Sequence, residues 1–195
     1  AIAATAAALC IASCGTSGTA YENVKLDFDS HVGESGERGP MMGADKGTFE
    51  GGHRGAYMTR HNGEKLPIGE WIYWYPNGQK KLRAYYKLGT PHGKWLMWDP
   101  AGTLRLEGHY RLGRGVGNWI AYYSTGQKQH EGHFNNDEEV GLWTFWYING
   151  NKRMEGNFKY GQWHGDWKFY TPNGAVAFIA KYKNGRLIDR RGEGE

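Results

Sequence analysis

The chain has 195 residues, which is enough for one domain of ordinary size with extensions. Glycine (31 residues) and aromatic residues (15%) are far above average use, a composition that favours many short strands joined by tight turns and argues against a helical protein. The formal net charge of +4 is mild and the basic residues are dispersed, so we expect no nucleic-acid partner.

Residues 1–14 form a separate segment of small apolar residues that ends at Cys14. A stretch of this length is too short to cross a bilayer as a helix but fits the apolar region of a secretory signal. Residues 11–14 resemble a bacterial lipobox, in which a small residue precedes the cysteine that receives a lipid. The resemblance implies a truncated lipoprotein signal and a protein held at the bacterial cell envelope only by a lipid on Cys14, and Gly15 favours the outer membrane. The alternative is a small-residue tail in which Cys10 and Cys14 form a local disulfide.

Residues 15–46 are rich in Gly, Ser, Asp and Glu, and we expect a flexible tether because such a segment cannot bury enough apolar area to order itself. Residues 47–68 resemble the repeats that follow without matching them in register, which predicts a degenerate N-terminal cap. Five copies of a 24-residue unit then occupy residues 69–188, and residues 189–195 are a polar tail.

Each repeat opens with Gly-x-Trp, and the spacing is constant across the five units. Positions within a unit are numbered 1 to 24 from the opening glycine. Positions 9 and 10 are Asn-Gly in three units, which predicts a two-residue type I′ hairpin turn because both residues of that turn need a positive φ. A second turn at positions 20 and 21, with Gly at position 21 in four units, is predicted to join each unit to the next. We expect this second turn to place position 14 against the Trp of the next unit and position 16 against its opening Gly.

The hairpin turn determines the predicted pairing within each unit. It places position 3 opposite position 16 and position 1 opposite position 18, so each Trp faces a Gly or Ala and each opening Gly is covered by a Tyr or Phe. Because side chains alternate along a strand, positions 1, 3, 5, 14, 16 and 18 share one face, which we expect to be the core. The predicted structural core residues are Trp71, Trp95, Trp119, Trp143, Trp167, Gly108, Gly132 and Gly156. The predicted fold class is all-β, an elongated, twisted antiparallel meander of stacked β-hairpins.

The repeat written by residues 141–158, Gly-x-Trp-x-x-Trp-Tyr-x-Asn-Gly-x-x-x-x-Glu-Gly-x-Phe, resembles the MORN-repeat variant of bacterial proteins. That variant occurs in proteins described as YwqK-family antitoxin components, and the resemblance covers residues 69–188. It implies an elongated sheet of stacked hairpins that acts as a scaffold for protein or lipid-associated assembly and carries no catalytic residues of its own.

Positions 2, 4, 6, 13, 15 and 17 are predicted to point away from the core, and position 6 is aromatic in every unit. With an advance of about 10 Å per unit, these aromatic side chains would form a ladder, and Lys or Arg at position 13 would lie opposite three of them in cation–π contact. The ladder would suit a glycan strand such as peptidoglycan or an extended protein partner, whereas the alternative is that these pairs only stabilise the sheet. The predicted binding ladder is Trp74, Trp98, Tyr122, Trp146, Tyr170, Lys81, Arg105 and Arg153.

No group of residues indicates catalysis or metal binding. His109 and His133 both occupy position 17 but lie two strands apart, too far to share a metal, and His130 at the inward position 14 is expected to be a core histidine. A row of carboxylates at position 15 is interpreted as cross-strand charge pairs, because glycosidase chemistry needs a cleft that an open sheet does not offer. The row consists of Glu107, Glu131 and Glu155. We therefore expect no enzyme activity, no metal and no cofactor.

These features predict a non-catalytic repeat scaffold that binds a protein or glycan partner at the bacterial cell envelope. The alternative is an antitoxin or immunity protein that neutralises a partner toxin.

Overall fold

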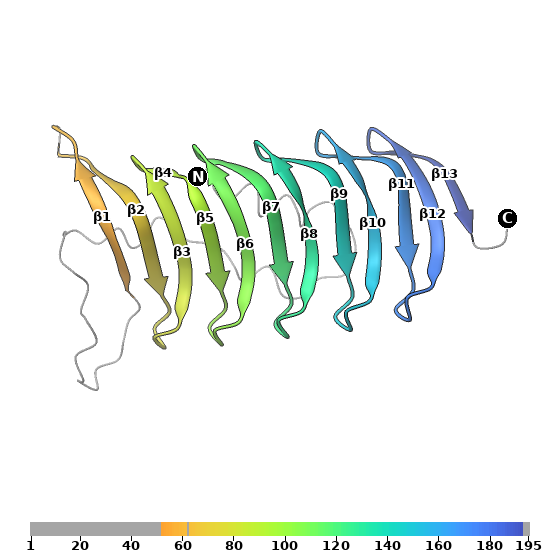
Figure 1. The fold of residues 1–195 in the computed structure, drawn as a ribbon, viewed down its shortest axis with the longest axis horizontal. Coiled ribbons are helices and arrows are strands. Elements are labelled where there is room, and N and C mark those ends of the chain that lie inside the picture. Colours follow the sequence, from red (N-terminus) through yellow and green to blue (C-terminus); the bar gives the residue numbers. More distant parts are fainter. Residues whose placement is uncertain (1–51, 62, 193–195) are drawn as a thin grey trace.

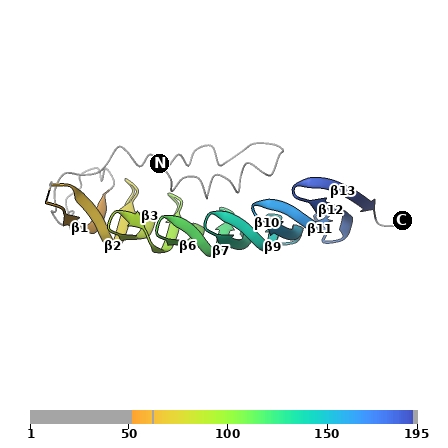
Figure 2. The ribbon, with the colours of Figure 1, turned by 90° about the horizontal axis from the view of Figure 1, so that it is seen from above.

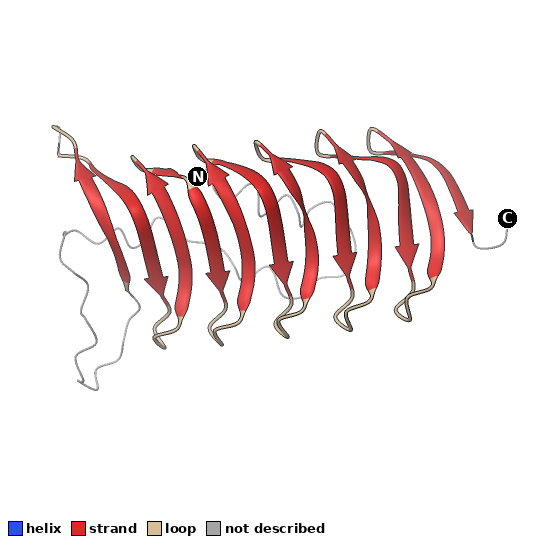
Figure 3. Cartoon of the chain, in the orientation of Figure 1, coloured by secondary structure: helices blue, strands red, loops and turns tan. Residues whose placement is uncertain are grey.

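The computed structural model describes residues 52–61 and 63–192, and these form one antiparallel sheet without any helix (Figure 1, Figure 3). Successive strands are neighbours throughout, apart from the short β4, which pairs with β3 beside β5. The predicted all-β meander of hairpins is confirmed, whereas Cys14 and the expected signal and tether lie outside the described residues. The strands are β1 (His53–Thr59), β2 (Lys65–Trp74), β3 (Lys80–Lys87), β4 (Thr90–Pro91), β5 (Gly93–Trp98), β6 (Leu104–Arg111), β7 (Arg114–Tyr122), β8 (Lys128–Asn135), β9 (Glu138–Trp146), β10 (Lys152–Lys159), β11 (Gln162–Tyr170), β12 (Val176–Lys183) and β13 (Arg186–Gly192).

The sheet is a single layer whose strands stand side by side along the long axis of the molecule (Figure 1). Seen from above, the strands are curved and the sheet twists from β1 to β13 (Figure 2). Within the described part of the chain, no second layer covers either face. Stability must therefore come from side chains that pack along one face and not from the contact of two layers.

Strand pairing within each unit follows the predicted register. In the third unit Trp119 pairs with Gly132, and Gly117 pairs with Phe134. The same pairs recur in the other units: Trp71 with Ala84, Trp95 with Gly108, Trp143 with Gly156 and Trp167 with Ala180.

The hairpin turn inside each unit differs from the predicted type I′ turn. In the first unit, Gly78 N donates to Tyr75 O at 2.9 Å and Tyr75 N donates to Gln79 O at 2.8 Å, which makes a three-residue loop. Only Gly78 has a positive φ (83°), so its partner Asn77 is not in the left-handed region. Asn77 instead accepts a hydrogen bond from Gln79 N at 3.1 Å through its side chain. The Asn-Gly pair therefore predicts the position of the turn correctly, but Asn77 stabilises the turn through its side-chain hydrogen bond and not through left-handed backbone geometry.

Left-handed geometry at both central residues occurs in the turn that joins one unit to the next. Leu112 has a φ of 50° and Gly113 a φ of 82°. Leucine is disfavoured in this region because its Cβ approaches the following carbonyl oxygen. The residues at this position of the five turns are Leu88, Leu112, Asn136, Tyr160 and Asn184.

Replacing Leu112 by Asn should stabilise the protein by about 0.5–1 kcal/mol, because Asn tolerates left-handed geometry and the leucine side chain is 63% exposed. Denaturant unfolding of the two proteins measures the difference. Leu142→Asn is a matched control, since Leu142 is similarly exposed (58%) but lies in a strand without a positive φ. An unchanged or lower stability of L112N would show that the turn is not strained.

Pairing between units follows the predicted register next to the turn, where His109 pairs with Val116, and is shifted by two residues beyond it, where Leu106 pairs with Ala121 and not with Trp119. Between the pairs Glu107–Ile120 and His109–Val116 the single residue Gly108 faces the three residues 117–119, so β7 bulges. The opening glycine is required for this bulge, because Gly117 has a φ of 72°. The predicted aromatic cover does not explain why the opening residue is glycine, since a methyl group built on Gly117 would meet no neighbouring side chain or strand within 4 Å.

The predicted core is observed, because the five indole side chains at position 3 are between 0% and 4% exposed. The rings of Trp119, Trp143 and Trp167 each lie on the position-16 glycine of the preceding unit, and a methyl group on Gly108 would lie 2.2 Å from the Trp119 ring. Trp119 is also held edge-on between Tyr110 (centroids 5.1 Å apart) and Phe134 (5.7 Å). In the predicted cap, Gly55 of β1 lies in the same way under Trp71. The core is thus a continuous row of rings along one face.

His130 takes part in this row, with its ring 6.1 Å from Trp143 and 5.6 Å from Phe145. Burial, together with the nearby Arg153 guanidinium as the smaller cause, lowers the pKa of His130 to about 4. The unfolded chain binds this proton near pH 6.5, so His130 should destabilise the fold as pH falls from about 6.5 to about 4.

His130→Leu should therefore flatten the pH dependence of the unfolding free energy between pH 7 and pH 4.5, by on the order of 1–3 kcal/mol over this range. Denaturant titrations at several pH values give the slope. Met154→Leu is the control, because Met154 occupies the same position in the next unit and has no titrating group. A slope that H130L leaves unchanged would mean that the imidazole is hydrated in the fold.

Candidate functional site

The face of the sheet opposite the indole row, called the outward face, is the candidate site. It carries positions 2, 4, 6, 15 and 17, and no other described strand packs on it. The five position-6 aromatic side chains are half-buried among their neighbours on this face. The residues that the sequence assigned to the ladder there are Trp74, Trp98, Tyr122, Trp146 and Tyr170.

The two tyrosines at position 6 contact carboxylates of the preceding unit. Tyr122 Oη donates to Glu107 Oε1 at 2.6 Å, and Tyr170 makes the same 2.6 Å bond to Glu155. The Tyr122 hydroxyl holds the pKa of Glu107 below its usual range, and Lys94 Nζ, 3.3 Å from Glu107 Oε2, adds to this effect. Glu107 is therefore an ionised acceptor with a fixed orientation.

The cross-strand charge pairing predicted for the position-15 row is observed for Glu107 with Lys94, whereas the other two carboxylates pair with a lysine of their own strand. Lys128 lies 2.6 Å from Glu131, and Lys152 lies 2.7 Å from Glu155. Lys128 also lies over the ring of Trp146, 5.7 Å from its centroid. The partners of these carboxylates therefore lie at positions 2 and 6 of neighbouring strands and at position 12 of the same strand.

The basic residues assigned to the ladder do not lie opposite the position-6 aromatics, so this part of the prediction is wrong. Trp74 pairs with Lys80, and Lys81 at position 13 is the extra residue of a bulge. Lys81 lies over Tyr75 (5.6 Å) instead, and Arg153 lies over Phe145 (5.9 Å), which belongs to the core face. The sequence pattern missed this because a bulge changes which face a side chain takes.

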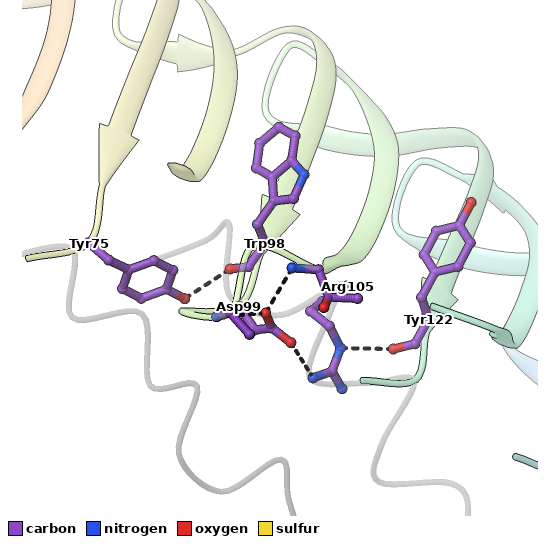
Figure 4. A network of polar contacts seen from close by, with 7 residues as sticks. Tyr75, Trp98, Asp99, Arg105 and Tyr122 are labelled. Carbon is purple, nitrogen blue, oxygen red and sulfur yellow. Dashed lines mark hydrogen bonds and ion pairs between the residues drawn. The ribbon is translucent and has the colours of Figure 1, made fainter. Parts of the chain in front are cut away.

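Arg105, the third basic residue, joins two units through a contact that the sequence analysis missed. Its Nε donates to Tyr122 O of the next unit at 2.9 Å, and its Nη1 lies 3.3 Å from Asp99 (Figure 4). One unit earlier, Tyr75 Oη donates to Trp98 O at 2.9 Å (Figure 4). Tyr123 and Tyr147 repeat the tyrosine bond in the later units. Where Asp99 replaces the position-7 tyrosine, Arg105 provides the equivalent bond.

Tyr147→Phe should lower the free energy of unfolding by about 0.5–1.5 kcal/mol, because it removes the 2.9 Å bond from Tyr147 Oη to Tyr170 O and leaves the ring in place. Thermal or denaturant unfolding measures this loss. Tyr160→Phe is the control, since Tyr160 is 73% exposed on a turn and should change stability by less than about 0.5 kcal/mol. If Tyr147→Phe and Tyr160→Phe changed stability equally, the hydrogen bond from Tyr147 Oη to Tyr170 O would not stabilise the fold.

Near its centre the outward face has a hollow of about 370 Å³ that the sequence did not indicate. It lies above Gly108, where β7 bulges away from β6, and a second hollow of about 150 Å³ over β8 and β9 shares Asn118, Ile120 and His133 with it. Together the two hollows are called the trough. Its lining side chains are Glu107, His109, Asn118, Ile120, Glu131 and His133, with the exposed Leu142 at one end. The only sequence signal of the trough is that Glu-Gly-His occurs at both residues 107–109 and residues 131–133.

No group of three or more His, Cys, Asp or Glu side chains in residues 52–61 and 63–192 could hold a metal ion. Within the same residues, no helix is long and apolar enough to cross a membrane.

The fold and the outward face define an open, single-layer repeat protein. The family model described as the MORN repeat variant matches residues 67–88, 91–111, 116–136 and 163–184. The chain therefore contains MORN repeats of the variant type and is a repeat scaffold. Residues 141–158, which carry the motif most completely, are outside the matched segments, although their pairing and the buried Trp143 repeat those of the other units.

Comparison with known proteins adds little beyond this family. No curated protein matches the chain. Among solved structures, a crystal structure of a GtfA/B complex bound to UDP and GlcNAc is 18% identical over 57% of this chain, with a TM-score of 0.25. The chain spans 22% of the length of that protein, and a likeness at this TM-score supports no statement about function.

Proposed function

We propose that this protein is a non-catalytic repeat scaffold that binds an extended protein or glycan partner along its outward face at the bacterial cell envelope. One observation carries the proposal: the same side-chain positions recur in every unit on a face that no other described strand covers. A repeated surface of this kind suits a partner that is itself extended, because each unit can contact it in the same way. A location at the envelope is supported by the lipobox-like residues that end at Cys14.

Several features of the outward face support binding without catalysis. Ion pairs and hydrogen bonds hold the pKa of Glu107 and of Glu155 below the usual range and so favour their charged form. A general acid would need a carboxylate whose pKa is raised, in a cleft that excludes water. Fixed polar groups and half-buried aromatic rings are instead the components of a recognition surface.

Retention on purified peptidoglycan tests the proposal with a glycan partner. The triple variant Trp74→Ala, Trp98→Ala, Trp146→Ala removes three rings of the outward face, and we expect it to lose most of the retention shown by the wild type. The control is the triple variant Leu88→Ala, Leu112→Ala, Tyr160→Ala, which removes three exposed apolar side chains from turn tips. Circular dichroism establishes that both variants are folded. Equal retention of wild type and the tryptophan variant would exclude the position-6 aromatics as the binding surface.

The second candidate function is an antitoxin or immunity protein, favoured by the resemblance of the repeats to those of YwqK-family antitoxin components. Co-expression with the product of a neighbouring toxin-like reading frame tests it, through rescue of growth. Rescue by a secreted form only would support an immunity role at the envelope, and failure of every neighbouring product to be toxic would remove this candidate.

A further inference from the structure

The trough lies where β7 bulges against β6. Gly108 faces residues 117–119 across the strands, and the Trp119 ring lies on its core side. Gly132 and Trp143 are arranged in the same way beside the second, adjoining hollow. A volume of about 370 Å³ for the larger hollow is in the range of small-molecule sites.

The polar groups of the trough are oriented by bonds within the sheet. Glu107 is held by Tyr122 and Lys94, and Glu131 is held by Lys128. His133 Nδ1 lies 2.9 Å from Asn118 Oδ1. When Nδ1 carries the proton, His133 Nε2 is left as an acceptor and the Asn118 amide nitrogen as a donor. The trough thus presents donors and acceptors side by side, in fixed positions.

This mixture of groups selects the class of ligand. A peptide strand would need free backbone groups at a sheet edge or a set of apolar pockets, but the trough lies over strands that are paired on both sides and has Ile120 as its central apolar residue. A metal ion is not favoured, because no group of three or more His, Cys, Asp or Glu side chains in the described residues could hold one, and the carboxylates of the trough disfavour an anion. Sugar hydroxyl groups both donate and accept hydrogen bonds, so they fit alternating donors and acceptors.

We infer that the trough is a binding site for a neutral oligosaccharide, which lies across β6 to β9 with one sugar over Ile120 and its hydroxyl groups bonded to Glu107, Asn118 and His133. Four neighbouring strands span about 14 Å, enough for more than one sugar ring. The inference rests on the proposed function, because it names the chemical class of partner for the same outward face. It differs from the ladder hypothesis by assigning the contacts to positions 2, 4, 15 and 17.

Titration of the full chain with soluble tetrasaccharides tests the inference. Chitotetraose and cellotetraose are added to the ¹⁵N-labelled protein, and the shifts of backbone amides give both the affinity and the place of binding. With at least one of the two probes, we expect saturable shifts centred on residues 107–109, 118–120 and 131–133. The double variant Asn118→Ala, His133→Ala should weaken binding at least about tenfold, because it removes an amide and an imidazole that bond the sugar.

The matched control is Asn157→Ala, Asp166→Ala, which changes positions 17 and 2 of the following units outside the trough. It should bind like the wild type. Absence of saturable shifts with both probes, or equal weakening by both double variants, would overturn the inference. If peptidoglycan retention still depends on the position-6 tryptophans in that case, the proposed function stands without the trough. Loss of both results would overturn both proposals.

Discussion

Trp119→Ala should lower the free energy of unfolding by about 3–5 kcal/mol, the range found for large aromatic side chains removed from a core. The indole is 4% exposed and lies edge-on against Tyr110 of one unit and Phe134 of its own. In a repeat array each unit is stabilised chiefly by its neighbours, so the loss should uncouple the second unit from the third. Guanidinium unfolding followed by tryptophan fluorescence and circular dichroism measures the change, with a broader transition if the two halves separate.

Trp98→Ala is the control for this prediction, because Trp98 is half-buried at position 6 of the outward face and lies outside the row of buried rings. Its replacement should cost less than half as much. If the two variants lost the same stability, the two faces would be equivalent and the assignment of the core to the position-3 face would fail.

The pairing within each hairpin could be predicted because alternation and the constant 24-residue period both constrain it. A two-residue loop places Trp119 opposite Gly132 directly. The observed three-residue loop gives the same pair, because a bulge in the second strand restores the register. Such a bulge occurs at position 13, where Lys81 is the extra residue. The core face was therefore predicted correctly from a turn whose type was wrong.

The two-residue shift in the pairing between units could not be predicted, because it depends on backbone geometry that the alternation of side chains does not show. Three residues, 117–119, face the single residue Gly108, and only the positive φ of Gly117 allows this. Leu112 in a left-handed turn is equally hidden, since its side chain argues against that conformation. Turn preferences placed both turns correctly, but they also predicted left-handed geometry at both residues of the Asn-Gly turn, where only the glycine has it.

The candidate site was likewise predicted only in part. The position-6 aromatics were placed on the outward face by alternation alone, and the structure puts Tyr122 there against Glu107. Arg105 and Arg153 were misplaced because position 13 is bulged. The trough was missed because its lining residues come from four neighbouring strands, β6 to β9, and the bulges between these strands do not show in the pattern of side chains.

Gly108→Ala should destabilise the protein by about 1–3 kcal/mol or more through the Trp119 ring, which lies 2.2 Å from where the new methyl group would be placed. A rigid ring between Tyr110 and Phe134 cannot move away as a flexible side chain would. The cost should therefore depend on Trp119, although the strand partner of Gly108 is Trp95. This separates contact across a hairpin from contact between units.

A double-mutant cycle measures the distinction. In the Trp119→Ala background, Gly108→Ala should cost close to nothing, because the methyl group enters space that the ring has left, and the coupling free energy should be about 1–3 kcal/mol. In the Trp95→Ala background, Gly108→Ala should keep most of its cost. A larger coupling to Trp95 than to Trp119 would mean that each indole packs on the glycine of its own hairpin. The units would then be joined chiefly by backbone pairing and by bonds such as that from Arg105 to Tyr122.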